Sequence, residues 1–208
     1  MPFASPGVRN LQPMHVLEGG VKSVKAFALL CAGLIALALA ESARADTPSP
    51  AAVKAAFVYN FAKFVEWPTG AFFDAQAPLT LCLLRARESY DAVFTTIEGK
   101  PVQGRTLAVK HSVALKELKA CQMVYLDEHD AGRTRDALRA LSETPVLTVS
   151  DIGGFAESGG MIGLFAADDK IRFEVNVEAA HIGRLKISAQ LLSLARIIRG
   201  PAVNRESK

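Results

Sequence analysis

The chain has 208 residues and a formal net charge of +3, and 50% of its residues are hydrophobic. This length supports one domain with a proper hydrophobic core. Two of the excess positive charges lie before residue 46, so the remainder carries a net charge of only about +1, which excludes the broad electrostatic attraction typical of nucleic-acid-binding domains.

Residues 22–46 carry the pattern of a secretory signal peptide. Lys22 and Lys25 give a positive start, Ala26–Ala40 is an uncharged apolar run, and Ala43 and Ala45 form a small-x-small exit. These are the parts of an export signal, and the run is shorter than the roughly 20 residues that a membrane span needs. We expect cleavage after Ala45 and a working protein outside the cytoplasm; a retained membrane anchor is the alternative.

The sequence therefore predicts three parts of the chain. Residues 1–45 comprise an upstream extension and the cleavable signal peptide, residues 46–200 form a single folded domain, and residues 201–208 form a flexible polar tail. No segment after residue 46 is apolar for long enough to cross a membrane.

The first half of the domain alternates helices with short apolar strands. Ser49 and Pro50 suit the start of a helix that carries the stripe Phe57, Phe61 and Phe64 and ends before Trp67. We then expect strands at 79–84, 105–109 and 123–126 and helices at 89–97, 113–119 and 131–141. This alternation indicates a largely parallel sheet covered by helices.

After a fourth strand at 146–149, the alternation of helices and strands gives way to two consecutive strands. Residues 161–165 and 171–175 predict a hairpin joined by the polar turn 166–170, and 176–182 predict a short helix. Ser188 then caps a last helix with an apolar face that consists of Leu191, Leu192, Ala195 and Ile198. The predicted fold is a single α/β domain with a mostly parallel central sheet of about six strands flanked by helices, a C-terminal β-hairpin and a terminal helix.

Two cysteines remain after cleavage, Cys82 and Cys121. Two thiols in an oxidising compartment favour one disulfide, which would close a loop of about 40 residues. Two separately buried thiols are the alternative. Neither cysteine has a Cys or His at the spacing of a metal ligand, so we expect no metal there.

Known catalytic motifs are absent after the signal segment. Gly-x-Ser-x-Gly does not occur, and none of His111, His129 and His181 lies in a recognisable catalytic motif. His129 belongs to the run 127–130, which we interpret as a solvated loop leading into a helix, because four neighbouring residues in a turn rarely converge on one ion. We expect no enzyme activity, no cofactor and no metal.

The glycine-rich segment 150–160 follows a buried strand, which is where α/β folds place their ligands. Its backbone amides could bind an anion, with Arg172 as the complementary charge. The segment matches neither a P-loop nor a dinucleotide fingerprint. We favour the interpretation that the segment forms a pair of tight turns that redirects the chain into the hairpin. If the segment does bind an anion, the alternative function is that of a periplasmic protein that binds small anionic molecules.

Three ordered motifs resemble the YfiR family of periplasmic proteins. The first is the helix 56–68, the second combines 146–151 with the glycines up to residue 162, and the third runs from 172–176 to 185–192. The resemblance covers roughly residues 51–198. It identifies the domain of residues 46–200 as YfiR-like.

This resemblance implies a regulator. YfiR-type proteins repress an inner-membrane diguanylate cyclase by binding its periplasmic sensory region, which lowers cyclic-di-GMP and affects biofilm formation. An OmpA-like outer-membrane lipoprotein can sequester the repressor, and the proteins are typically homodimers. Cys82 and Cys121 match the usual cysteine pair of the family, and a second pair after Cys121 is missing, which leaves this bridge as a structural one.

We take the following as candidate residues for binding a partner or ligand: Asn60, Ser150, Gly153, Gly154, Gly159, Gly160, Arg172 and Asn176. The exposed sides of the helix that contains Phe57–Phe64 and of the final helix are the expected contact surfaces.

Overall fold

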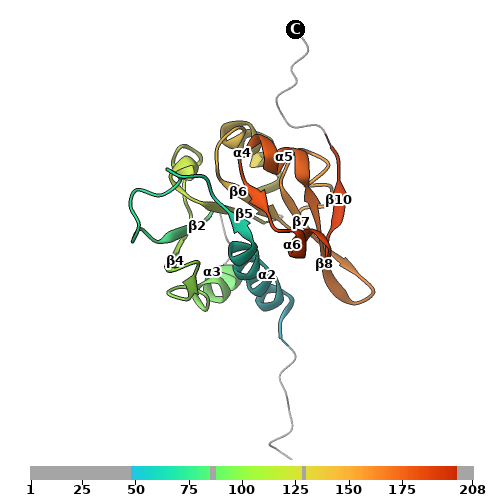
Figure 1. Cartoon of the computed structure of the whole chain (residues 1–208). Coiled ribbons are helices and arrows are strands. Elements are labelled where there is room, and N and C mark those ends of the chain that lie inside the picture. Colours follow the sequence, from blue (N-terminus) through green and yellow to red (C-terminus); the bar gives the residue numbers. More distant parts are fainter. Residues whose placement is uncertain (1–47, 85–87, 128–129, 201–208) are drawn as a thin grey trace, which may run out of the picture. The chain divides into compact units, whose positions relative to one another are not determined.

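The computed structural model describes residues 48–84, 88–127 and 130–200 (Figure 1). The predicted signal segment, 1–45, and the predicted tail, 201–208, lie outside the described residues. Within these described residues, no helix has the length and apolar character to cross a membrane.

An eight-stranded sheet has the strand order β10-β8-β7-β6-β5-β2-β4-β3. Its strands are β2 (Leu79–Leu83), β3 (Pro101–Val102), β4 (Arg105–Lys110), β5 (Met123–Leu126), β6 (Leu147–Ser150), β7 (Ile162–Ala167), β8 (Lys170–Asn176) and β10 (Arg196–Ile198). Within this sheet, as far as the structure describes it, only the β7–β8 and β3–β4 pairs are antiparallel, so the prediction of a mostly parallel α/β sheet is confirmed.

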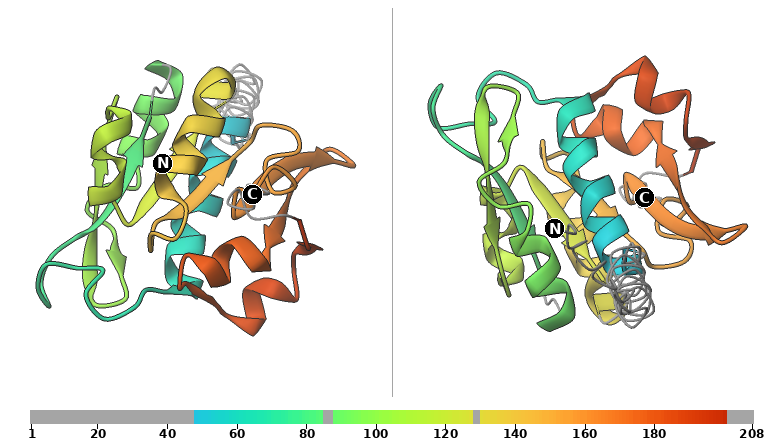
Figure 2. Two further views of the ribbon diagram at one scale, coloured as in Figure 1. Left: turned by 90° about the horizontal axis from the view of Figure 1, so that it is seen from above. Right: turned by 90° about the horizontal axis from the view of Figure 1, so that it is seen from below.

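Helices cover both faces of this sheet (Figure 2). They are α2 (Pro50–Phe64), α3 (Glu88–Thr95), the 3₁₀ helix η2 (Leu115–Ala120), α4 (Ala131–Leu141), α5 (Val177–Ile182) and α6 (Ala189–Leu192). One core joins α2 and α6 to alternate residues of the strands, such as Leu81 and Leu83. The other core joins η2 and α4 to the opposite residues, such as Cys82 and Val124, because side chains alternate along a strand.

Helix α2 begins and ends where the sequence predicts. Ser49 accepts a hydrogen bond from the Ala52 amide at 3.1 Å, which caps the first turn. After Phe64 the chain extends into the short strand β1 (Val65–Glu66), which pairs with β9 (Lys186–Ile187) in a separate two-stranded sheet. The predicted aromatic stripe lies in the core, where Phe61 is 5.1 Å from Phe173 between ring centroids.

The disulfide between Cys82 and Cys121 is present and confirms the predicted pairing. It connects β2 to the residue that follows η2. Both cysteines are buried in the core that includes α4, together with Leu118 and Leu138.

Several expected elements differ from those of the structure. The sheet has eight strands rather than about six, since β3 and β10 are too short to show an apolar pattern. The hairpin turn consists of Asp168 and Asp169 alone, both with positive φ (50° and 57°), because β7 and β8 continue pairing up to Ala167 and Lys170.

The predicted terminal helix is reduced to the four residues of α6. The chain then forms β10, which runs parallel to β8 with Arg196 opposite Glu174. The buried Glu174 carboxylate accepts hydrogen bonds from the Arg196 guanidinium. This ion pair and the strand pairing override the helical spacing of the apolar residues in this segment.

Candidate functional site

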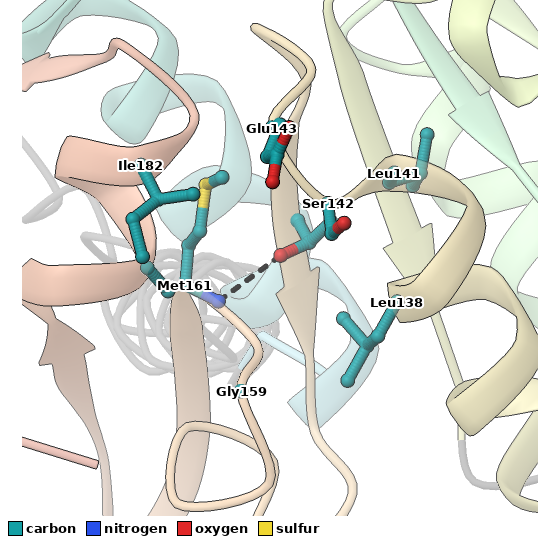
Figure 3. Close-up of a pocket in the computed structure, with 9 residues that line it drawn as sticks. Leu138, Leu141, Ser142, Glu143, Gly159, Met161 and Ile182 are labelled. Atoms are coloured by element: carbon teal, nitrogen blue, oxygen red, sulfur yellow. Dashed lines mark hydrogen bonds between the residues drawn. The ribbon is translucent and has the colours of Figure 1, made fainter. Parts of the chain in front are cut away.

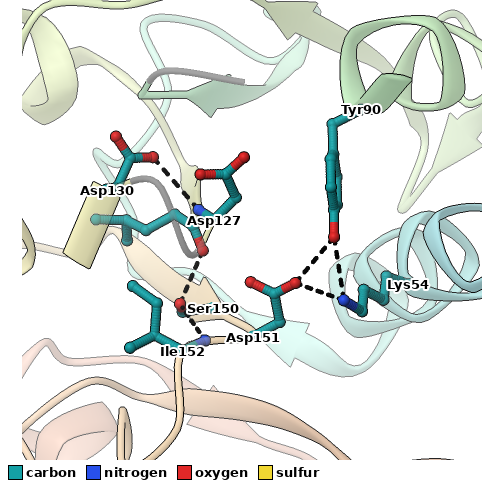
Figure 4. Close-up of polar contacts among 8 residues, drawn as sticks. Lys54, Tyr90, Asp127, Asp130, Ser150, Asp151 and Ile152 are labelled. Atoms are coloured by element: carbon teal, nitrogen blue, oxygen red, sulfur yellow. Dashed lines mark hydrogen bonds and ion pairs between the residues drawn. The ribbon is translucent and has the colours of Figure 1, made fainter. Parts of the chain in front are cut away.

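The carboxyl ends of β2, β5 and β6 are where this fold would place a ligand. Strand β2 lies between β4 and β5, so the chain leaves β2 toward one side of the sheet and returns on the other. Such a reversal of strand order defines a crevice at the carboxyl ends of the strands. Asp127 follows β5 directly and Asp151 follows β6 directly, which places both carboxylates at this edge (Figure 4).

Asp151 is the centre of a polar cluster that joins three elements. The Lys54 ammonium of α2 lies 2.5 Å from Asp151 Oδ2, and the Tyr90 hydroxyl of α3 donates to the same oxygen at 3.0 Å. Lys54 also donates to the Tyr90 hydroxyl at 3.0 Å. The Asp151 side chain is only 7% exposed, so this ion pair connects α2 and α3 to the end of β6 in a largely dry environment.

Two buried oxygens beside this cluster have no hydrogen-bond partner among the described residues, namely Asp151 Oδ1 and the Tyr125 hydroxyl. Tyr125 lies in β5, is 1% exposed, and stacks on Tyr90 with ring centroids 5.9 Å apart. Burial, assisted by the neighbouring Asp151 carboxylate and Tyr90 hydroxyl, raises the pKa of the Tyr125 phenol.

The electrostatics of the cluster favour a structural role. Burial raises the pKa of Tyr90. Desolvation by burial opposes the charge of Lys54, but the hydrogen bonds to Asp151 and Tyr90 prevail and raise the pKa of the ammonium. Lysine and tyrosine with raised pKa values keep their protons at neutral pH, so both groups can donate hydrogen bonds to the Asp151 carboxylate. The cluster therefore holds α2 and α3 to the end of β6.

The interpretation of 127–130 as a solvated loop is wrong for its two aspartates. Asp127 and Asp130 are each 1% exposed, and the Asp127 amide donates to Asp130 Oδ2 at 3.3 Å. This contact links the end of β5 to the residue that precedes α4, while His129 and the residue before it lie outside the described residues. Among the residues that the structure describes, no three metal-ligating side chains come together.

The glycine-rich segment uses its amides internally. The amides of Ser158, Gly159 and Gly160 donate to carbonyl oxygens of the same loop at 2.9–3.2 Å. Gly154 and Gly159 have positive φ angles of 71° and 98°, which tight turns require. These hydrogen bonds weigh against the anion-binding interpretation, which stays a prediction.

Ser150 and Asn176 hold this loop in place. The buried Ser150 hydroxyl donates to the Leu126 carbonyl at 2.7 Å and accepts from the Ile152 amide at 3.0 Å. Asn176 donates to the Ala156 carbonyl at 2.8 Å and caps α5 by accepting from the Ala179 amide. Both candidates thus have complete structural roles in the fold.

Two of the remaining candidates, Arg172 and Asn60, lie apart from the loop, and Gly153 lies within it. Arg172 is exposed on β8 opposite Phe165, near the hairpin turn, and its closest carboxylate is Asp168 at 4.0 Å. The structure therefore does not bring Arg172 to the glycines that precede β7. Asn60 is exposed on α2, where its side-chain oxygen accepts from Lys63 at 3.2 Å. Gly153 is exposed, and a side chain there would meet nothing.

Gly160 has a packing role that the sequence does not reveal. A Cβ at this position would overlap the ring of Phe155, which is buried beneath the loop. Gly159 lines a cavity between α4, α5 and the start of β7, with Leu138, Met161 and Ile182 (Figure 3). Its volume of about 30 Å³ leaves room for roughly one water molecule, so it is no ligand site.

Sequence reasoning missed the Lys54–Tyr90–Asp151 cluster. Asp151 does carry a local signal, because it follows a buried strand at its carboxyl end. Its partners are 97 and 61 positions away in the chain, and nothing in their local sequence distinguishes them from surface residues.

The fold and these contacts define a disulfide-bonded α/β domain whose polar clusters stabilise structure. The chain matches the model of the family described as YfiR/HmsC-like (DUF4154) over residues 51–196, and it belongs to this family. The family is one of regulatory, non-catalytic periplasmic proteins associated with diguanylate cyclase systems. At the level of the family, the chain is thus a periplasmic regulator of cyclic-di-GMP signalling.

Proposed function

We propose that this protein represses an inner-membrane diguanylate cyclase by binding the periplasmic sensory region of the enzyme. The observation that carries this proposal is the family match, which extends from the start of α2 to the start of β10. Repression lowers cyclic-di-GMP and thereby limits biofilm formation. An OmpA-like outer-membrane lipoprotein that competes for the same surface would release the cyclase, and the repressor acts as a homodimer.

Repression requires that the protein distinguish two conformations of the cyclase. A binding partner shifts a conformational equilibrium only by its difference in affinity for the two states. The repressor must therefore contact a part of the sensory region that differs between the active and inactive forms, and a lipoprotein that occupies this contact relieves repression without touching the cyclase.

The surface that we assign to this contact begins on α2. The stripe Phe57, Phe61 and Phe64 packs into the core, which leaves Asn60 and Lys63 as its exposed neighbours. The Lys63 ammonium lies 4.1 Å from the centre of the Tyr59 ring. This helix face therefore presents an amide and a cation rather than an apolar stripe.

The surface continues onto the C-terminal segment. The Ser188 amide donates to the Phe64 carbonyl at 2.9 Å, which places the start of α6 beside the end of α2. Leu194 and Ile197, which follow α6, are 72% and 42% exposed. Exposed apolar side chains next to polar ones are typical of protein-binding surfaces.

A genetic experiment tests the partner. Deleting the gene for this protein should raise cellular cyclic-di-GMP in a strain that contains the cyclase and should have no effect in a strain without that cyclase. A rise of equal size in both strains would exclude this cyclase as the target.

A variant experiment tests the surface. Lys63→Glu and Leu194→Glu should each fail to restore low cyclic-di-GMP when expressed in the deletion strain. Arg135→Glu, a charge reversal at an exposed position on α4, is the matched control and should restore it fully, because α4 covers the opposite face of the sheet. Full repression by both surface variants at normal protein levels would refute the assignment.

A further inference from the structure

A hollow beneath the loop that connects β1 to β2 is lined by residues other than those assigned to the surface discussed above. Its volume is about 530 Å³, within the range of small-molecule sites. The residues that line it include Glu66, Trp67, Phe72, Asp74, Gln103 and Arg105. The Trp67 and Phe72 rings meet edge to face with centroids 6.3 Å apart and form its aromatic wall.

The walls of the hollow are held by hydrogen bonds from both sides. Trp67 Nε1 donates to the Gln122 carbonyl at 3.1 Å, and Gln122 Nε2 donates back to the Ala71 carbonyl at 2.8 Å. Asp74 Oδ1 accepts from the amides of two residues that follow it in the loop, at 2.6–2.7 Å. The hollow is thus largely formed in advance of any ligand, which reduces the entropy lost on binding.

The side-chain donors of the hollow are directed at the backbone. Gln103 Nε2 donates to the carbonyls of Ala62 and Val65, both at 2.7 Å. Arg105 Nη1 donates to the Asp74 and Ala77 carbonyls at 2.9 and 2.6 Å. The Arg105 guanidinium also covers the face of the Phe72 ring at 3.8 Å. These groups are therefore committed to holding the loop.

The groups of the hollow that remain available to a ligand are hydrogen-bond acceptors and the Trp67 ring. The Glu66 carboxylate, Asp74 Oδ2 and Gln103 Oε1 make no hydrogen bond or ion pair within the described residues. The two carboxylates outnumber the single guanidinium, so the hollow carries a net negative charge. Carboxylates beside an indole are the combination that attracts an organic cation.

We propose that this hollow binds a small organic cation, an ammonium group carried on an aromatic or aliphatic body. The ammonium would lie against Glu66 and Asp74, and the apolar body would pack on Trp67. Neutral compounds of the same shape bind more weakly because they lack the attraction to the two carboxylates, and anionic compounds are repelled by them. Binding of a small cation at this site is a function additional to the proposed repression and does not depend on it.

The fluorescence of Trp67 tests this proposal directly, since it is the only tryptophan of the chain. Purified exported protein is titrated with phenethylammonium chloride, with 2-phenylethanol and with sodium phenylacetate at low and high salt. We expect a saturable change in emission with the cation that weakens at high salt, and affinities for the other two compounds lower by about tenfold or more.

Two variants separate the site from general effects. Glu66→Gln should weaken binding of the cation about fivefold, the size expected for one exposed ion pair. Glu98→Gln, which removes an exposed carboxylate elsewhere, should change nothing. The absence of a saturable signal, an equal response to all three compounds, or unaltered binding by Glu66→Gln would overturn the proposal. None of these outcomes affects the repression assays.

Discussion

Removal of the bridge between Cys82 and Cys121 should destabilise the domain by about 4 kcal/mol. The two cysteines are 39 positions apart, and the chain-entropy relation gives this value for the freedom that a loop of that length regains in the unfolded state. Typical domains have a total stability of about 5–15 kcal/mol, so the bridge accounts for a large share.

Urea unfolding of the double variant Cys82→Ala/Cys121→Ala measures this loss. Both side chains lie in the core around α4, where alanine leaves a small apolar residue and adds only a minor packing loss. Addition of a thiol reductant to the urea series should bring the native protein down to the stability of the variant and leave the variant itself unchanged. A loss below about 1 kcal/mol would refute the reasoning from loop length.

Three further predictions concern the cluster around Asp151 and the glycine loop. Lys54→Met should lower the free energy of unfolding, measured in urea, by about 3 kcal/mol, because it leaves the buried Asp151 carboxylate without its cation. The added substitution Asp151→Asn should restore most of this free energy, and no recovery would contradict the ion-pair explanation. The raised pKa of Tyr125 means that folding favours its protonated form, so stability is complete below the unfolded pKa of about 10 and falls above it by about 1.4 kcal/mol per pH unit. Urea midpoints between neutral and alkaline pH should show this fall, and Tyr125→Phe should make it shallower; an identical slope would exclude Tyr125 as its source. Gly160→Ala should destabilise by about 2 kcal/mol through overpacking, whereas Gly153→Ala at an open position should have little effect, and equal melting temperatures of the two variants would contradict the packing account.

The roles of the candidate residues depend on contacts with residues that are distant in the sequence. Ser150 and Asn176 occur in recognisable motifs, but their partners Leu126 and Ala156 come from other parts of the fold, so the sequence could mark them and could not assign their role. The sequence offers Arg172 as a positive charge that complements an anion at the glycine loop. The register of the hairpin instead places it opposite Phe165.

The residues that line the hollow could not be grouped from the sequence either, because they come from separate segments of the chain. Glu66, Trp67 and Asp74 are near one another in the chain, but Gln103 and Arg105 reach them only because β3 and β4 form the edge of the sheet beside this loop. A hydrogen-bonding side chain on an edge strand has no sequence pattern that reveals which loop it holds.

The sequence alone determined the α/β alternation, the start of α2 at Ser49, its end before Trp67 and the pairing of Cys82 with Cys121, because apolar periodicity, helix caps and the parity of thiols are local or compositional properties. Only the tertiary structure decided the order of the strands, the conversion of the C-terminal residues into β10 and the meeting of Lys54 with Asp151. Each of these depends on contacts between residues far apart in the chain, whose free energy exceeds the local preference of the segments involved.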